Sequence, residues 1–121
     1  MRLHFGNVYT VDIYQFWRHN SVYTNEVMQF DWGDEKNEAN LAKHGVSFEL
    51  ASYVFDDPLH RSVLDPYEHE ERWQTIGIAK TLTPILVVHT ITEIAGEEVE
   101  LIRIISARLA TAHERRAYEE S

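Results

Sequence analysis

Hydrophobic positions between residues 34 and 55 recur at helical spacing. They predict a helix over residues 34–44, whose first turn is acidic and whose last turn is basic, as the helix dipole favours. Gly45 follows directly, and glycine is the usual residue after a helix end. Ser47 is a suitable N-cap for a second, short helix, which must end before Pro58 because proline cannot continue the helical hydrogen-bond ladder.

Strand patterns dominate the second half of the chain. Two short segments, residues 29–32 and 59–64, have the composition of strands. Three longer segments are rich in apolar and β-branched residues and are separated by turn residues. These longer strands are expected over residues 72–79, 85–91 and 99–107. Their short connections favour an antiparallel meander.

The chain is predicted to end in a further helix. Thr111 and Glu114 have the spacing of a capping box, which opens a helix that runs to about residue 120. The resulting order is β-α-α-β-β-β-β-α. This order predicts an α+β fold in which helices cover one face of a sheet and the other face is available for function.

Residues 1–27 are rich in aromatic side chains but show no clear period. We therefore divide the chain into a leader of uncertain structure, residues 1–27, and one domain, residues 28–121. Two interpretations of the leader stay open. It is either an element that packs on the domain or an extension that precedes a translation start at Met28.

The composition is that of a globular protein with one hydrophobic core. The absence of cysteine excludes disulfides and thiolate metal sites. No apolar run has the length needed to span a bilayer, and the first residues do not have the pattern of a signal peptide. We therefore expect a cytoplasmic protein that does not bind membranes.

The formal net charge of −9 argues against a protein that coats nucleic acid, because phosphate binding needs local cations. The basic residues are nevertheless unevenly distributed, and residues 103–118 carry four arginines with one acid, Glu114. The arginines are Arg103, Arg108, Arg115 and Arg116. Arginine suits phosphate because its planar fork donates two parallel hydrogen bonds. The alternative is a set of ion pairs with acidic surface residues.

Other basic residues can join this set. Arg72 reaches the same sheet face as Arg103 if their strands are neighbours; the alternative is an ion pair with the acidic run before it. Lys36 and Lys43 share a face of the predicted helix, and Asn40 can line the same groove as Lys36. The alternative for these helix residues is a solvated face.

The histidines do not indicate a metal site. His69 stands in an acidic run, but alternate side chains of an extended segment point apart and no spaced ligand pair accompanies it. His89 lies in an apolar strand and is predicted to be a core histidine. The chain has no glycine-rich phosphate loop, and nothing in it calls for a cofactor.

Several blocks of sequence resemble the BrnT family of toxins, and the resemblance extends over residues 28–120. The blocks are Phe30-Asp31-Trp32, Lys36-Asn37, Asn40-Leu41-Ala42-Lys43-His44-Gly45-Val46-Ser47-Phe48, Val54-Phe55-Asp56-Asp57-Pro58, Glu71-Arg72-Trp73, Ile76-Gly77, Arg103-Ile104-Ile105-Ser106-Ala107-Arg108, Glu114-Arg115-Arg116 and Tyr118-Glu119. Because many blocks occur in the right order, the match is more specific than any single motif.

The resemblance implies a RelE-like fold, in which two N-terminal helices and one C-terminal helix pack on an antiparallel sheet. It implies a ribonuclease that arrests translation by cleaving RNA. Such a toxin is neutralised by a BrnA-like antitoxin that carries a ribbon-helix-helix DNA-binding domain. Operator DNA would be contacted only through the antitoxin.

Cleavage of RNA without a metal requires a base for the 2′-hydroxyl, cations for the phosphorane and an acid for the leaving oxygen. For a toxin of this kind, the residues expected to bind the phosphate are Arg72, Arg103 and Arg108. The candidates for acid and base, which the sequence does not rank, are His44, Glu71, Glu114 and Tyr118. The residues expected to hold the RNA are Lys36, Lys43, Arg115 and Arg116.

A second hypothesis belongs to another class, a catalytically inactive toxin-like module that only holds an antitoxin or another protein. Its acidic surface would match a basic partner segment. A structural domain with scattered ion pairs is a third. RNA cleavage distinguishes the first hypothesis from the others, and co-purification with a small basic or DNA-binding protein distinguishes the second from the third.

Overall fold

The computed structural model describes residues 2–5, 8–12, 27–94 and 99–120. One seven-stranded sheet forms its centre, in the order β1-β2-β3-β7-β6-β5-β4. The strands are β1 (Arg2–Phe5), β2 (Val8–Asp12), β3 (Val27–Asp31), β4 (Arg61–Leu64), β5 (Trp73–Gly77), β6 (Ile85–Glu93) and β7 (Val99–Leu109). The helices are α2 (Asp34–His44), α3 (Phe48–Ser52), the 3-10 helix η1 (Tyr53–Asp56) and α4 (Ala112–Glu119). In these ranges, no helix is long and apolar enough to cross a membrane.

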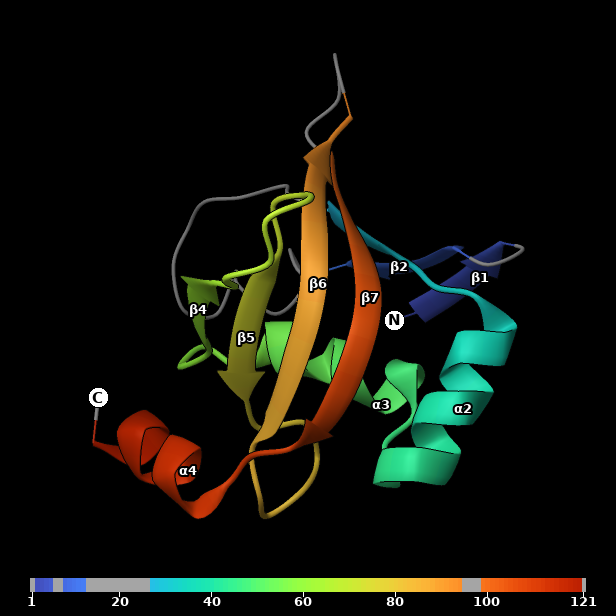
Figure 1. Ribbon diagram of the computed structural model, residues 1–121. Helices are drawn as coiled ribbons and strands as arrows, with labels where there is room; N and C mark the ends of the chain where they lie inside the picture. The colour runs from blue at the N-terminus through green and yellow to red at the C-terminus, as the bar shows by residue number, and fades with distance from the viewer. Residues whose placement is uncertain (1, 6–7, 13–26, 95–98, 121) are drawn as a thin grey trace.

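The two helices after β3 form where the sequence predicts them. α2 has the predicted bounds, and Gly45 ends it in the left-handed conformation with φ of 72°. Ser47 caps α3, because its side chain accepts a hydrogen bond from the amide of Leu50. Figure 1 shows α3 crossing behind β5, β6 and β7, with α2 beside the lower end of β7.

The prediction of an antiparallel sheet is wrong at one pair of strands. β4 to β7 form the expected antiparallel meander, but β3 runs parallel to β7, with Asp31 opposite Arg103. Two helices separate β3 from the next strand, so no tight turn fixes its direction. β1 and β2 extend the sheet beyond β3, and the rest of the leader lies outside the described residues.

A β-bulge in β7 decides which face of the sheet its two arginines occupy. Arg103 lies opposite Thr90 of β6, whereas Arg108 lies opposite Leu86, and the register shifts by one residue between them. In a regular strand, residues 103 and 108 would point to opposite faces. Because Thr90 and Leu86 share a face of β6, the shift at Ile105 places both arginines on the same face.

The core fills the space between the sheet and the helices. Phe48, Val54 and Ile104 are among its fully buried residues. Asn40 is also buried, which corrects the prediction that it lines a groove with Lys36. Its amide nitrogen donates to the carbonyl oxygens of Ala107 at 2.7 Å and Val46 at 2.9 Å, and its oxygen accepts from the Ala107 amide at 3.2 Å. Asn40 therefore fastens α2 to β7.

His89 is the core histidine that the sequence predicts. Its ring is fully buried, with the Thr75 hydroxyl 2.6 Å from Nε2 and the Thr90 carbonyl oxygen 3.2 Å from Nδ1. Burial lowers the pKa of His89 to about 4. The ring is therefore neutral at pH 7, and both of its nitrogens have hydrogen-bond partners.

The terminal helix α4 begins at the predicted capping box, formed by Thr111 and Glu114. It has no buried residue. Figure 1 shows it beyond the end of β7 and away from the faces of the sheet. This placement differs from the predicted packing on the sheet, because the side chains of α4 are mostly polar and offer no apolar stripe to bury.

Candidate functional site

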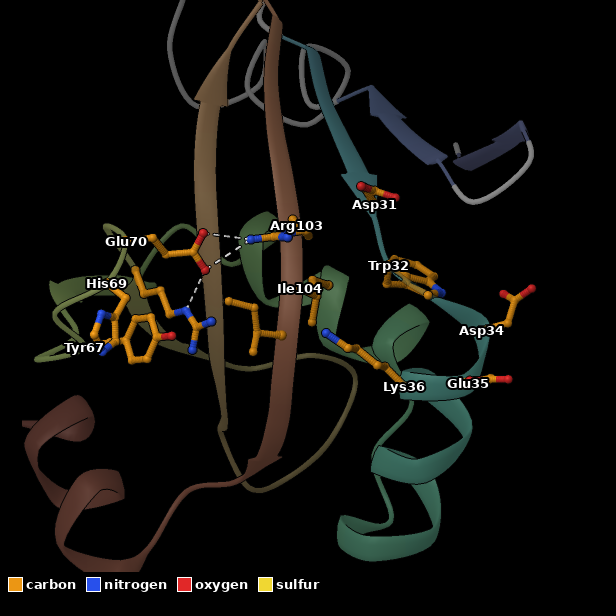
Figure 2. A pocket seen from close by; sticks show the side chains of 13 residues that line it. Asp31, Trp32, Asp34, Glu35, Lys36, Tyr67, His69, Glu70, Arg103 and Ile104 are labelled. Atoms are coloured by element: carbon orange, nitrogen blue, oxygen red, sulfur yellow. Dashed lines mark hydrogen bonds and ion pairs between the residues drawn. The ribbon is translucent and has the colours of Figure 1, made fainter.

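A groove of about 850 Å³ opens where four segments meet: the end of β3, the first turn of α2, the middle of β7 and the loop before β5. We call it the arginine groove. The residues that line it are Asp31, Trp32, Gly33, Asp34, Glu35, Lys36, Tyr67, His69, Glu70, Arg72, Arg103, Ile104 and Ile105. Figure 2 shows the loop residues on one side of this groove and the α2 residues on the other.

Two arginines from distant segments converge on one carboxylate in the arginine groove. Arg72 donates from Nε to Glu70 Oε2 at 2.9 Å. Arg103 donates from Nη2 to both oxygens of Glu70, at 3.0 and 3.2 Å. The hydrogen bond from Arg72, together with the positive charges of both arginines and the bonds from Arg103, holds the pKa of Glu70 below its ordinary value. The cluster remains solvent-accessible, since the Arg103 side chain is 47% exposed.

An aromatic side chain lies directly beside these arginines. The guanidinium carbon of Arg72 lies 3.8 Å from the ring centroid of Tyr67, which is a cation–π contact. The His69 ring meets the Tyr67 ring edge-on, with centroids 5.2 Å apart. Tyr67 is 41% exposed. An exposed ring next to guanidinium groups is the arrangement on which a nucleobase stacks while its phosphate is bound.

The helical side of the arginine groove carries both signs of charge. Lys36 extends from α2 toward Arg103, whereas Asp34 and Glu35 point away from the arginines (Figure 2). Lys36 is exposed. The cation of α2 therefore faces the two arginines across the groove. Arg72 and Arg103 meet there although β6 separates β5 from β7, so the neighbouring strands that the sequence analysis required are not needed.

Arg108 lies outside the arginine groove and is bound to α4. Its two terminal nitrogens donate to the two oxygens of Glu114, at 2.8 and 3.0 Å. Glu114 also accepts a hydrogen bond from the Thr111 amide at 2.9 Å. The bond to Arg108, with the bonds to Thr111, lowers the pKa of Glu114 to about 2, and Glu114 in turn raises the pKa of Arg108. This pair fixes the first turn of α4.

Tyr118 fastens the other end of α4 to the body of the protein. Its hydroxyl donates to the carboxylate of Asp57, which also accepts from the Ile78 amide at 2.8 Å. Burial, together with the neighbouring carboxylate, raises the pKa of Tyr118 to about 12. Burial alone would raise the pKa of Asp57 too, but these hydrogen bonds hold it below its ordinary value.

The remaining predicted residues are not brought into the arginine groove. His44 ends α2, eight residues beyond Lys36, which is about 12 Å along the helix axis. Glu71 is exposed and does not line the groove, although its neighbour Glu70 does. Three predicted RNA-holding residues are exposed elsewhere on α2 and α4, namely Lys43, Arg115 and Arg116.

No site role was predicted from the sequence for the three loop residues of the groove before Arg72, namely Tyr67, His69 and Glu70. These residues stand among charged residues in a polar loop. Most solvated loops have such a composition, so it does not indicate a site. The run of acids in this loop did signal a partner for Arg72. Only the path of the loop decides that Glu70 is that partner, because successive side chains of an extended segment point in different directions.

Comparisons with known proteins show which family the chain belongs to. A family model described as "Ribonuclease toxin, BrnT, of type II toxin-antitoxin system" matches residues 32–114. The chain is also similar to the crystal structure of the ribonuclease toxin BrnT from Brucella abortus, with 24% sequence identity and a TM-score of 0.44. The aligned region covers 66% of this chain and 92% of the Brucella protein. No curated protein matches the chain. Because the family model spans more than half of the chain, the protein belongs to the BrnT family of ribonuclease toxins of type II toxin–antitoxin systems.

Proposed function

We propose that this protein is a metal-independent endoribonuclease that cleaves RNA in the arginine groove and thereby arrests translation. One observation carries the proposal. Arg72 and Arg103, which are 31 residues apart in the sequence, reach the same anionic group in an open groove. A carboxylate and a phosphate present similar pairs of oxygens to a guanidinium fork, so the site is shaped for an RNA phosphate.

The arginine groove supplies the charge that metal-free cleavage needs. The phosphorane that forms when a 2′-oxygen attacks phosphorus carries extra negative charge, which fixed cations stabilise. Arg72 and Arg103 would bind its oxygens, and Lys36 would approach from α2. Tyr67 would hold one neighbouring base by stacking, since its ring is exposed and sits against Arg72.

In this proposal, the cations outside the groove do not contact the scissile phosphate. Lys43, Arg115 and Arg116 are exposed, so they can contact phosphates farther along a bound RNA. Arg108 is held by Glu114 and reaches phosphate only if that pair opens. His44, Glu71, Glu114 and Tyr118 remain candidates for proton transfer by sequence alone, and their positions outside the groove do not support that role.

The partner proposed for this toxin is a BrnA-like antitoxin with a ribbon-helix-helix domain. A type II system implies a protein antitoxin. The net charge of −9 suits a basic partner segment, because opposite charges favour association. In this proposal, operator DNA is reached only through the antitoxin. The proposal includes a RelE-like fold, which the helix-covered sheet and the antiparallel meander support.

The proposed function is tested by induced expression in a bacterial host. We expect growth to stop within the first generations after induction and cellular RNA to be fragmented. Co-expression of its BrnA-like antitoxin is expected to restore growth. The measurements are colony counts, and gel analysis of total RNA at fixed times after induction.

The Glu70 carboxylate also favours a second candidate function, because it neutralises both arginines of the free protein. If this ion-pair cluster does not open for RNA, the protein is a binding module that only holds a partner. Normal growth, with the induced protein soluble and intact, would support that second function and contradict the first.

A further inference from the structure

The acid and base of the proposed cleavage have no assigned residue in the arginine groove. We propose that Glu70 is the general base that takes the proton of the RNA 2′-hydroxyl and that His69 is the general acid that protonates the leaving oxygen. This inference rests on the proposed ribonuclease function. It deepens that function by naming two residues that the family match does not assign.

The position of Glu70 follows from its contacts. Its carboxylate lies 2.9 Å from Arg72 and 3.0 Å from Arg103, the two groups proposed to bind the scissile phosphate. A phosphate that binds to these two guanidinium groups must lie beside the Glu70 carboxylate. In RNA the 2′-hydroxyl is next to the phosphate it attacks, so that hydroxyl lies within reach of Glu70.

The binding of phosphate would also strengthen Glu70 as a base. In the free protein, the hydrogen bonds and charges of the two arginines hold the pKa of Glu70 low. When the guanidinium groups turn to phosphate oxygens, the carboxylate loses these donors and gains a neighbouring negative charge. Both changes raise the affinity of a carboxylate for a proton. Glu70 thus becomes a better proton acceptor at the moment when substrate is bound.

His69 belongs to the same loop as Glu70 and is its direct neighbour in the chain. It lines the same groove, and Figure 2 shows its ring beside Tyr67 while Glu70 points toward Arg103. The loop thus presents two different proton-transfer groups to one groove, a carboxylate for the attacking oxygen and an imidazole for the leaving oxygen. Imidazole is the most frequent proton-transfer group in such chemistry.

The proposed step is balanced. Glu70 takes the proton of the 2′-hydroxyl, and the 2′-oxygen forms a bond to phosphorus. The bond between phosphorus and the 5′-oxygen breaks, and His69 gives its proton to that oxygen. The products are a 2′,3′-cyclic phosphate and a 5′-hydroxyl end, and exchange with solvent restores both side chains.

The test compares matched variants on a fluorescent single-stranded RNA of mixed sequence. Glu70→Gln is compared with Glu68→Gln, which changes an exposed acid of the same loop that does not line the groove. His69→Ala is compared with His113→Ala, which changes an exposed histidine of α4. Affinity is measured separately with the 2′-O-methyl form of the same RNA, which cannot be cleaved. Thermal melting checks that each variant is folded.

For Glu70→Gln, we expect kcat to fall by about 10²-fold or more, with little change in affinity for the 2′-O-methyl RNA. The acidic limb of the pH–rate profile is expected to disappear, and Glu70→Asp is expected to recover part of the rate. The other titratable and charged groups that line the groove are Asp31, Asp34, Glu35, Lys36, Tyr67, His69, Arg72 and Arg103. Since they are all present in Glu70→Gln, a limb that persists would belong to one of them.

For His69→Ala, we expect a similar loss on ordinary RNA but a nearly normal rate on RNA with a bridging 5′-phosphorothiolate. The thiolate leaves without a proton and so does not need the acid. The inference is overturned if Glu70→Gln keeps more than about a third of the wild-type rate or gains activity. It is also overturned if affinity falls as far as rate, since Glu70 would then only position the arginines. Wild-type protein that does not cleave RNA at all would instead contradict the proposed function itself.

Discussion

Replacing Arg72 and Arg103 together with alanine is expected to lower kcat/KM for RNA cleavage by about 10⁴-fold, and each single replacement by about 10²- to 10³-fold. The reason is that both guanidinium groups are already aimed at one anion-binding position, where they would stabilise the charge of the phosphorane. If one arginine is replaced, the other still balances the charge of Glu70. If both are replaced, Glu70 is an unpaired anion that repels the RNA phosphate. The measurement is initial rate on a fluorescent single-stranded RNA.

Arg61→Ala is the matched control for these variants. Arg61 is an exposed arginine of β4 that does not line the arginine groove, and its loss changes the net charge equally. We expect the cleavage rate of this variant to stay within about threefold of the wild-type rate, because salt screens the attraction between RNA and distant surface charges. Equal losses in Arg61→Ala and Arg103→Ala would mean that the groove is not the site of cleavage.

Asn40→Ala is expected to lower the free energy of unfolding by about 3 kcal/mol. The side chain is buried and makes hydrogen bonds to the carbonyl and amide of Ala107 and to the carbonyl of Val46. Truncation leaves these buried backbone groups without their partner, and each such group costs about 1–3 kcal/mol unless water enters. The change is measured by urea denaturation of the purified protein.

Glu38→Ala is the control for Asn40→Ala, because Glu38 is exposed on the same helix. Its effect on the free energy of unfolding is expected to stay within about 0.5 kcal/mol. Asn40→Ala should also reduce RNA cleavage at temperatures where the protein remains folded, since Asn40 connects the helix of Lys36 to the strand of Arg103. A variant as stable as wild type would show that α2 is held to β7 by apolar packing alone.

Helices α2 and α3 could be predicted because their signals are local. Gly45 adopts the left-handed conformation that ends α2, and the Ser47 side chain caps α3, as their residue types indicate. The direction of β3 could not be predicted, since it depends on pairing with a strand about 70 residues later in the chain. The same limit applies to Asn40, whose partner Ala107 lies 67 residues away.

The candidate site was predictable in its cations and not in its proton-transfer groups. Arg103 stood out as part of the arginine-rich stretch near the end of the chain, and Arg72 as a basic residue at the start of a predicted strand. In the fold both reach the same carboxylate. Arg108 stood out equally, but its place beside Arg103 on one face depends on the bulge at Ile105, and its partner is Glu114. No local pattern predicts which residue of a polar loop turns toward a groove. Glu71, and not its neighbour Glu70, was therefore named from the sequence as a candidate for proton transfer.

The central claim is that this protein cleaves RNA by its own side chains. The most direct test is to incubate the purified protein with a single-stranded RNA in the presence of EDTA and to identify the new ends by mass spectrometry. We predict fragments with 2′,3′-cyclic phosphate and 5′-hydroxyl ends, formed at the same rate with or without EDTA. Intact RNA, or fragments with 3′-hydroxyl and 5′-phosphate ends that form only with added Mg²⁺, would contradict the claim.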